Sequence, residues 1–265
     1  ATGTAYTTLL NGFTLNSAGN GNAAVEVNVT FNSVKDIYQM AKKAALNLQM
    51  DSAQLVDYLL EDSILSKYNL TEEELPSLFF PNTYKMFWDT DVSSFVNRMA
   101  KEHQNFWTSD RLDKLEKIGL TSPAEAVTLA SIVYSEQVRV QSEWATIAGL
   151  YLNRLKIGMK LQSDPTFRFC WGDELDGVQR LTYAHRDRNC PYNTYLHAGL
   201  PPGPICIPPK KVVEAVLNRE KNNYIFMVAQ PNYSGLHDFA SNKNYSIHVK
   251  NAKIYSEWLR SEGIR

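Results

Sequence analysis

Glu136 lies on the apolar side of a predicted helix, where its carboxyl group is suited to acid–base chemistry. The segment 129–144 reads LASIVYSEQVRVQSEW. At 100° per residue, Glu136 lies within about 60° of Leu129, on the same side as Ile132 and Val133. A carboxyl group on an apolar face loses solvation of its charged form, so its pKa rises toward neutrality. A general acid that works near pH 7 requires such a pKa.

Two carboxylates have structural interpretations that the sequence leaves open. Glu136 can be a buried glutamate bonded to Arg139 or Arg154. Asp164 precedes a proline in QSDPT, where an aspartate commonly organises a turn through its own backbone. If Asp164 also faces a cleft with Glu136, the two resemble a glycosidase pair, which needs two carboxyl groups at a defined separation.

Three further segments carry candidate substrate-binding groups. PYNTY places Tyr192, Asn193 and Thr194 together, and these side chains offer a flat apolar ring beside donors and acceptors for hydroxyls and amides. The alternative is a turn with packed tyrosines. GLPPGPI (199–205) is stiffened by proline and suits a cleft wall. His237, in GLHDF, lies near a predicted strand start and is a candidate to line the same cleft.

Composition and motifs exclude several classes of function. The 265 residues carry a net charge of −1, and without a basic patch a nucleic-acid partner is not expected. The chain contains neither a zinc-ligand spacing nor a phosphate-binding glycine loop, so we predict no metal ion and no cofactor. Three cysteines are present, Cys170, Cys190 and Cys206. A disulfide between the first two is an option only in an oxidising compartment, and the sequence does not decide it.

The first half of the sequence predicts a small unit of strand, helix, helix and strand. VEVNVTF (25–31) alternates as a half-buried strand does. Ser33 is expected to cap a helix whose apolar stripe includes Tyr38, and Asp51 to cap a second helix. FFPNTYKMF (79–87) is the returning extended segment, and a further helix follows at 91–107.

The second half predicts a larger mixed unit that begins near residue 119. Ser122 and Glu125 form a capping box around Pro123, which starts the helix that carries Glu136. Further helices are expected at 143–158, after Pro208 and at 244–263, and two strands at 224–230 and 236–241. We predict a turn at 161–166, loops over 167–208, and a last helix with these residues facing inward: Tyr245, Val249, Ala252, Tyr255 and Leu259.

Five segments together resemble the endolytic murein transglycosylases of the YceG-like family. In order, they are LASIVYSEQ, LYLNRLKIGMKLQSDPT, PYNTY, GLPPGPI and GLHDF. The resemblance covers nearly the whole chain. It implies an α+β fold with a small LysM-like subdomain at about 25–85, inside an N-terminal region 1–118, and a catalytic domain with mixed helices and strands at 119–265. LFFPNTY matches the family's segment at the junction.

The resemblance also implies a reaction and a location. Family members cleave the β-1,4 bond between N-acetylmuramic acid and N-acetylglucosamine in peptidoglycan and leave a 1,6-anhydro end. One glutamate acts as acid and then base, and it matches Glu136. A second acidic residue often stands two positions earlier in the family, where this sequence has Tyr134. Asp164, Tyr192, Asn193, Thr194 and His237 are then candidates to orient or bind substrate.

The resemblance further leads us to expect trimming or termination of nascent glycan strands, at the outer face of the bacterial cytoplasmic membrane. The family is normally tethered there by one N-terminal membrane helix, which we expect outside this chain. Cell-wall synthesis enzymes are further candidate partners. Two other functions stay open: a hydrolase that uses a Glu136/Asp164 pair, and a peptidoglycan-binding module without catalysis.

Overall fold

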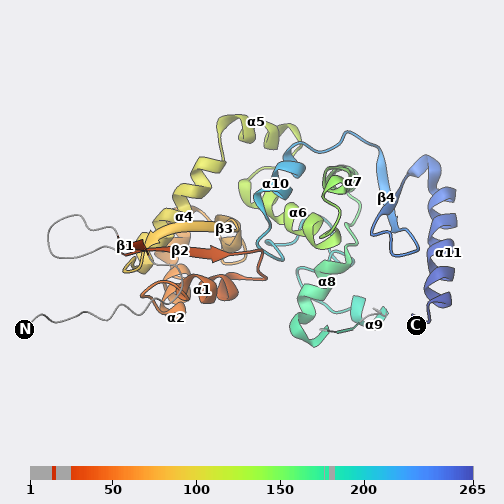
Figure 1. Cartoon of the computed structure of the whole chain (residues 1–265). Coiled ribbons are helices and arrows are strands. Elements are labelled where there is room, and N and C mark those ends of the chain that lie inside the picture. The colour runs from red at the N-terminus through yellow and green to blue at the C-terminus, as the bar shows by residue number, and fades with distance from the viewer. Residues whose placement is uncertain (1–13, 16–24, 176, 179–182, 265) are drawn as a thin grey trace, which may run out of the picture.

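An antiparallel sheet forms one end of the molecule (Figure 1). The structure is a computed structural model that describes residues 14–15, 25–175, 177–178 and 183–264. Its strands, in the order β1-β2-β3, are β1 (Thr14–Leu15), β2 (Val25–Phe31) and β3 (Asn82–Phe87). Val29 of β2 pairs with Tyr84 of β3, and both are buried. The two predicted strands of this unit are therefore confirmed, and they lie side by side.

Three short α-helices connect β2 to β3. They are α1 (Ile37–Ala45), α2 (Ser52–Leu59) and α3 (Asp62–Tyr68), followed by a 3-10 turn at Leu75–Leu78. Asp51 caps α2 as predicted. The prediction for α1 was wrong in two details: Asp36 is the cap, because the Ser33 hydroxyl donates instead to the carbonyl of Ile207, and Tyr38 is 50% exposed.

Two helices lead from this sheet to the centre of the molecule. They are α4 (Val92–Phe106) and α5 (Ser109–Lys117). Asp91 caps α4 through the backbone N–H of Ser94, at 2.6 Å. Phe106, at the end of α4, already belongs to the hydrophobic cluster of the second half. The expected helix at 91–107 is confirmed.

Helix α6 (Pro123–Glu136) runs through the middle of the second half, between α7 (Trp144–Lys156) and α10 (Lys210–Leu217). The Ser122 hydroxyl accepts the N–H of Glu125 at 3.2 Å, so the predicted cap is present. Every residue from Ala126 to Val133 is buried, which means that α6 is enclosed on all sides rather than along one stripe. Its last three residues, 134–136, are half-buried.

The predicted turn and loop region contains helices. Asp164 begins α8 (Asp164–Trp171), which continues into a 3-10 turn at Gly172–Leu175, and α9 covers Tyr183–Arg186. Proline at the second position of α8 suits a helix start, and this overrode the turn that we expected at 161–166. A disulfide joins Cys170 in α8 to Cys190, with Cα atoms 6.0 Å apart. Cys206 is free.

The C-terminal part is a hairpin covered by one long helix. Strands β4 (Tyr224–Ala229) and β5 (His237–Ser241) are antiparallel, as predicted, and α11 (Tyr245–Ser261) packs against both. The expected inward stripe of α11 is confirmed only in part, because Ala252, Tyr255 and Leu259 are half-buried. None of its residues is fully buried, and Tyr245 and Val249 are about half exposed. Figure 1 places α11 at the opposite end from the N-terminal sheet.

Two hydrophobic clusters support these parts. One surrounds β2, β3, α1 and α2, and the other surrounds α6, α7 and α10. Each cluster includes a residue from the other half of the chain: Phe80 packs in the cluster around α6, and Ile207 packs in the cluster around the N-terminal sheet. The molecule thus mixes helices with small antiparallel sheets. Within the described ranges, every helix falls short of the length and apolar character that a membrane span requires.

Candidate active site

The carboxyl group of Glu136 accepts hydrogen bonds from two hydroxyl groups of the second half. Tyr151 of α7 donates to Oε1 at 2.7 Å, and Ser163, just before α8, donates to the same oxygen at 2.5 Å. Two segments outside α6 therefore hold one oxygen of the carboxyl group that α6 carries. The last turn of α6, which follows the buried stretch Ala126–Val133, places the side chain where these two segments meet.

Burial dominates the electrostatics of Glu136. Loss of solvation raises its pKa, and the charge of Asp164 raises it further. The hydrogen bonds from Ser163 and Tyr151 and the nearby His237 act in the opposite direction. The net result is a raised pKa, which favours the protonated acid over a wider pH range than for a free glutamate.

The structural ion pair considered for Glu136 does not form with any described residue. Arg154 donates instead to the backbone carbonyls of Leu161 and Ile225. Arg139 is exposed at the rim of the cleft described below. Glu136 thus relies on hydroxyl groups, which stabilise a carboxylate less than a paired cation does and leave it able to take up a proton.

Thr194 and Asn193, two of the predicted substrate-binding residues, lie inside the protein. The Thr194 hydroxyl accepts the backbone N–H of Ser163 at 3.0 Å and lies 2.8 Å from the Thr166 hydroxyl. The Asn193 amide donates to the carbonyls of Arg186 and Arg188, and its oxygen accepts the N–H of Tyr195. Both side chains are almost completely buried. In this geometry they hold the segment that presents Ser163.

Tyr192 and Asp164 each have a contact that involves helix α8 or its start. The Tyr192 ring packs against Phe169, with centroids 4.6 Å apart. Asp164 accepts the Tyr195 hydroxyl at 2.6 Å, and burial together with this bond raises the pKa of Tyr195. Asp164 influences Glu136 through its charge; no hydrogen bond joins these two described residues.

A cleft of about 360 Å³ opens beside Glu136. Its walls come from the end of α6, the β4–β5 hairpin and α11. His237 lines this cleft together with Glu136, whereas Asp164, Tyr192, Asn193 and Thr194 are not among its described lining residues. The structure therefore brings one of the five predicted binding residues into the same hollow as the predicted acid.

Glu143 fixes the orientation of His237. Its carboxylate lies 2.8 Å from Nδ1 of the imidazole and accepts the backbone N–H of His237 at 2.9 Å. The Gln137 amide donates to the same carboxylate at 2.7 Å and to the carbonyl of Gly235. The imidazole is thereby held with a carboxylate on one ring nitrogen, an arrangement that sets both its tautomer and its direction.

Three residues of the site were not predicted: Tyr151, Ser163 and Glu143. A tyrosine in the apolar run LYLNRL signals a buried hydroxyl that needs a partner. Ser163 precedes Asp164 in QSDPT, and only the fold brings it to Glu136. Glu143 is the last residue of a 3-10 turn, Gln141–Glu143, that lies after the end of α6. Its burial could not be predicted from the helix pattern.

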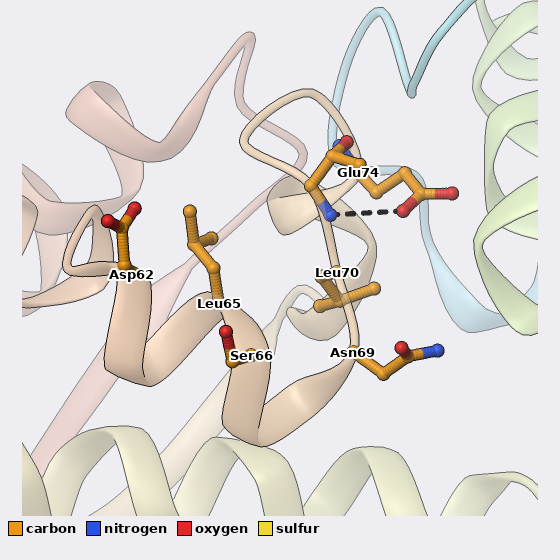
Figure 2. Close-up of a pocket in the computed structure, with 7 residues that line it drawn as sticks. Asp62, Leu65, Ser66, Asn69, Leu70 and Glu74 are labelled. Carbon is orange, nitrogen blue, oxygen red and sulfur yellow. Dashed lines mark hydrogen bonds between the residues drawn. The ribbon is translucent and has the colours of Figure 1, made fainter.

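A second hollow lies in the N-terminal unit (Figure 2). Its lining residues come from α3 and the segment after it, and are Asp62, Leu65, Ser66, Asn69, Leu70, Thr71 and Glu74. Glu74 accepts the backbone N–H of Thr71 at 3.1 Å, and the Thr71 hydroxyl accepts the N–H of Glu74 in return. No group of three metal-ligating side chains occurs anywhere in the described residues.

Comparisons with known proteins identify the family. A model of the YceG-like family matches residues 4–254. The chain therefore belongs to the YceG-like family. The family resemblance predicted from the sequence is confirmed.

Named relatives are similar over part of their length. The chain is 31% identical over 159 residues to a Bacillus subtilis protein named endolytic murein transglycosylase, covering 60% of this chain and 42% of that one. It is 27% identical over 201 residues to a Streptococcus pneumoniae protein of the same name, covering 71% of this chain and 36% of that one. The chain thus spans less than half the length of these relatives.

A crystal structure of a YceG-like protein from Listeria monocytogenes has the same fold. The TM-score is 0.66 at 24% identity, over 85% of this chain and 75% of the other. At this identity the likeness establishes the fold alone. The mixed helix-and-sheet architecture is thus shared with another member of the family.

Proposed function

We propose that this chain is the catalytic part of an endolytic transglycosylase that cleaves peptidoglycan strands. The observation that carries the proposal is one buried carboxyl group with a raised pKa, Glu136, beside a cleft in a chain of the YceG-like family. The names of the relatives support the same reaction class. The substrate bond would be the β-1,4 link from N-acetylmuramic acid to N-acetylglucosamine.

The proposed reaction needs one carboxyl group and no activated water. Protonated Glu136 donates its proton to the glycosidic oxygen as the bond from C1 of the muramic residue to that oxygen breaks. The C6 hydroxyl of the same sugar then attacks C1, and the ionised carboxylate accepts the hydroxyl proton. The products are a free N-acetylglucosamine hydroxyl and a 1,6-anhydro ring, and Glu136 returns to its protonated form.

The surrounding residues support both protonation states of Glu136. Ser163 and Tyr151 donate hydrogen bonds to Oε1, which stabilise the carboxylate formed after proton transfer. Burial favours the acid before the transfer. His237, oriented by Glu143, would contact the sugar within the cleft. Asn193 and Thr194 would act as positioning residues through Ser163, and Asp164 and Tyr192 are proposed to orient substrate from the α8 side.

The remaining features of the family are proposed on the same basis. The pairing of β2 with β3 around α1 and α2 supports a LysM-like subdomain at about 25–85, to which the structure adds a third helix, α3, before β3. We assign 1–118 to the N-terminal region and 119–265 to catalysis. The activity would serve termination or trimming of nascent strands at the outer face of the cytoplasmic membrane, with cell-wall synthesis enzymes as partners.

The experiment is an analysis of the products from purified glycan strands by mass spectrometry. The chain should yield 1,6-anhydro ends, lighter by one water than reducing ends. Glu136→Gln should reduce their formation by about 10²- to 10⁴-fold, the usual contribution of a general acid–base group. Glu74→Gln, at the other hollow, is the matched control and should leave the rate unchanged. Full activity of Glu136→Gln would end the assignment.

A hydrolase is the second candidate, because the charge of Asp164 reaches Glu136. A two-carboxylate hydrolase would release reducing ends, and Asp164→Asn would be as damaging as Glu136→Gln. For the transglycosylase, Asp164→Asn should keep most of the activity. Strands that are bound but never cut would instead indicate a binding module without catalysis.

A further inference from the structure

The cleft beside Glu136 has an aromatic side that the reaction outlined above does not use. Tyr233, at the tip of the β4–β5 turn, and Tyr255 and Trp258, from α11, line the same hollow as Glu136. The match to the family model ends at residue 254. Tyr255 and Trp258 therefore lie outside the residues that place this chain in the family.

The three rings form one connected group. The Tyr233 and Trp258 rings are 4.8 Å apart between centroids and nearly perpendicular, at 81°. Tyr255 and Trp258 are 5.6 Å apart. The edge-on contact between Tyr233 and Trp258 favours one relative orientation of these two rings. We call Tyr233, Tyr255 and Trp258 the aromatic wall.

Tyr233 is held in place although it is 69% exposed. Its hydroxyl donates to Glu262 at 3.0 Å, which ties the hairpin turn to the end of α11. Asn232 and Tyr233 both adopt the left-handed backbone region, with φ of 63° and 51°. Such a conformation is costly for a side chain as large as tyrosine, and here it belongs to the tight connection between β4 and β5, which places the ring at the tip of the turn.

Burial does not explain these aromatic residues. Helix α11 has no fully buried side chain, so the wall is not part of either hydrophobic cluster. Rings that are partly exposed and fixed in orientation lose little freedom on binding, which makes them effective contact surfaces. The ring of a pyranose sugar matches such a surface, because its C–H face is apolar and its hydroxyl edge is polar.

We propose that the aromatic wall stacks against a sugar ring of the glycan strand and sets the strand in register with Glu136. The polar edge of that sugar would be free to contact His237, which lines the same cleft. The inference rests on the proposed function, because it takes the occupant of the cleft to be a glycan strand. It adds a binding subsite made by the C-terminal helix and the hairpin turn.

The test measures binding and cleavage separately. Binding of purified, uncrosslinked glycan strands is measured by calorimetry in the Glu136→Gln background, where cleavage is blocked. Trp258→Ala should weaken binding by about tenfold, in line with the usual contribution of an aromatic contact. Trp258→Phe should recover most of the affinity. In the cleaving chain, Trp258→Ala should raise KM by a similar factor while kcat changes less than twofold.

Trp88→Ala is the matched control. Trp88 is 43% exposed and lies after β3 in the N-terminal unit, so its removal should leave affinity and KM unchanged. If Trp258→Ala fails to fold, Tyr233→Ala tests the same wall from the exposed turn. Equal effects of Trp258→Ala and Trp88→Ala, or no loss with either wall variant, overturn the inference.

The outcomes separate this inference from the proposed function. If cleavage gives 1,6-anhydro ends but does not depend on Trp258 or Tyr233, the proposed function is supported and the proposed role of the aromatic wall is contradicted. If strands are bound through the aromatic wall but never cut, the role of the wall is supported and the proposed function is contradicted. If strands are neither bound through the wall nor cut, both proposals are contradicted.

Discussion

Glu136 and Glu74 lie beside the two hollows and show how environment assigns a role to one residue type. Glu136 follows the buried stretch Ala126–Val133 of its helix, and one oxygen of its carboxyl group receives two hydroxyl donors. Glu74 is partly exposed and completes a reciprocal pair with Thr71, each side chain accepting the other's backbone N–H. That pair is a capping box, whose function is structural.

The difference teaches that burial, which raises the pKa of Glu136, gives a carboxyl group a chemical use, while the hydroxyl donors hold it in position. The hydroxyl donors of Glu136 come from distant segments, which require the whole second half to be folded. The two residues of the Glu74 pair are only three positions apart, so the pair forms locally. The support of Glu136 is therefore expected to be sensitive to changes that loosen the second half.

Removal of the disulfide should have the largest effect on this contrast. The Cys170–Cys190 bond closes a loop with a sequence separation of 20, for which chain-entropy estimates give about 3 kcal/mol of stability. The Cys170→Ser/Cys190→Ser double variant should lose about that amount in urea unfolding. Hydrogen exchange should rise in the segment 163–195, which carries Ser163 and Thr194, while the segment 62–74 stays protected.

Reduction of the unmodified chain serves as the control, since it should reproduce the double variant. If the oxidised, reduced and doubly substituted forms all unfold at the same urea concentration, the disulfide does not support the cleft. Equal loss of protection in both segments would show that the two regions depend equally on it.

Replacement of Glu136 itself should have the next largest effect, as a gain in stability. A carboxyl group whose pKa is raised in the fold costs stability once the pH exceeds its pKa in the unfolded chain. The loss grows with pH by about 1.4 kcal/mol per unit until the folded-state pKa is passed. Glu136→Gln removes this loss, and the amide oxygen of glutamine can still accept the hydroxyl donors.

The measurement is urea unfolding of both forms from pH 4 to pH 8. The variant should gain stability over the unmodified chain as the pH rises from 4 to 8, because only the unmodified chain carries a carboxyl group with a raised pKa. Glu74→Gln at pH 7 is the comparison and should stay within about 0.5 kcal/mol, as is usual for a surface substitution. A constant difference across the pH range would contradict the raised pKa of Glu136.

Local patterns predicted much of the fold. The alternation in β2, the cap of α2, the Ser122 cap of α6 and the β4–β5 hairpin each depend on a few neighbouring residues, and all are present. The other half of the predicted capping box differs, because Glu125 accepts the backbone N–H of Thr121 and not that of Ser122. The errors arose where distant contacts decided the outcome. Ser33 does not cap α1 because its hydroxyl bonds to Ile207, which is 174 positions away.

The site was predictable in part for the same reason. The apolar surroundings of Glu136 follow from helix periodicity, and so does the direction of its pKa. Its partners Tyr151 and Ser163 are 15 and 27 positions away, so no local pattern reveals them. The apolar residues of α11 misled the prediction, because they pack on a two-stranded hairpin that is too small to cover them.

The smallest expected effect is a pair of opposite shifts in the pH dependence of cleavage. The proposed reaction starts from protonated Glu136, so activity falls as the pH rises through its pKa. Ser163 stabilises the ionised form, and Asp164 disfavours it by charge repulsion. Ser163→Ala should therefore move the falling limb to higher pH, and Asp164→Asn should move it to lower pH. Rates measured from pH 4 to pH 9 on purified strands test both signs. Shifts in the same direction would mean that the falling limb reflects the titration of a group other than Glu136. The acid–base role that distinguishes Glu136 from Glu74 would then be contradicted.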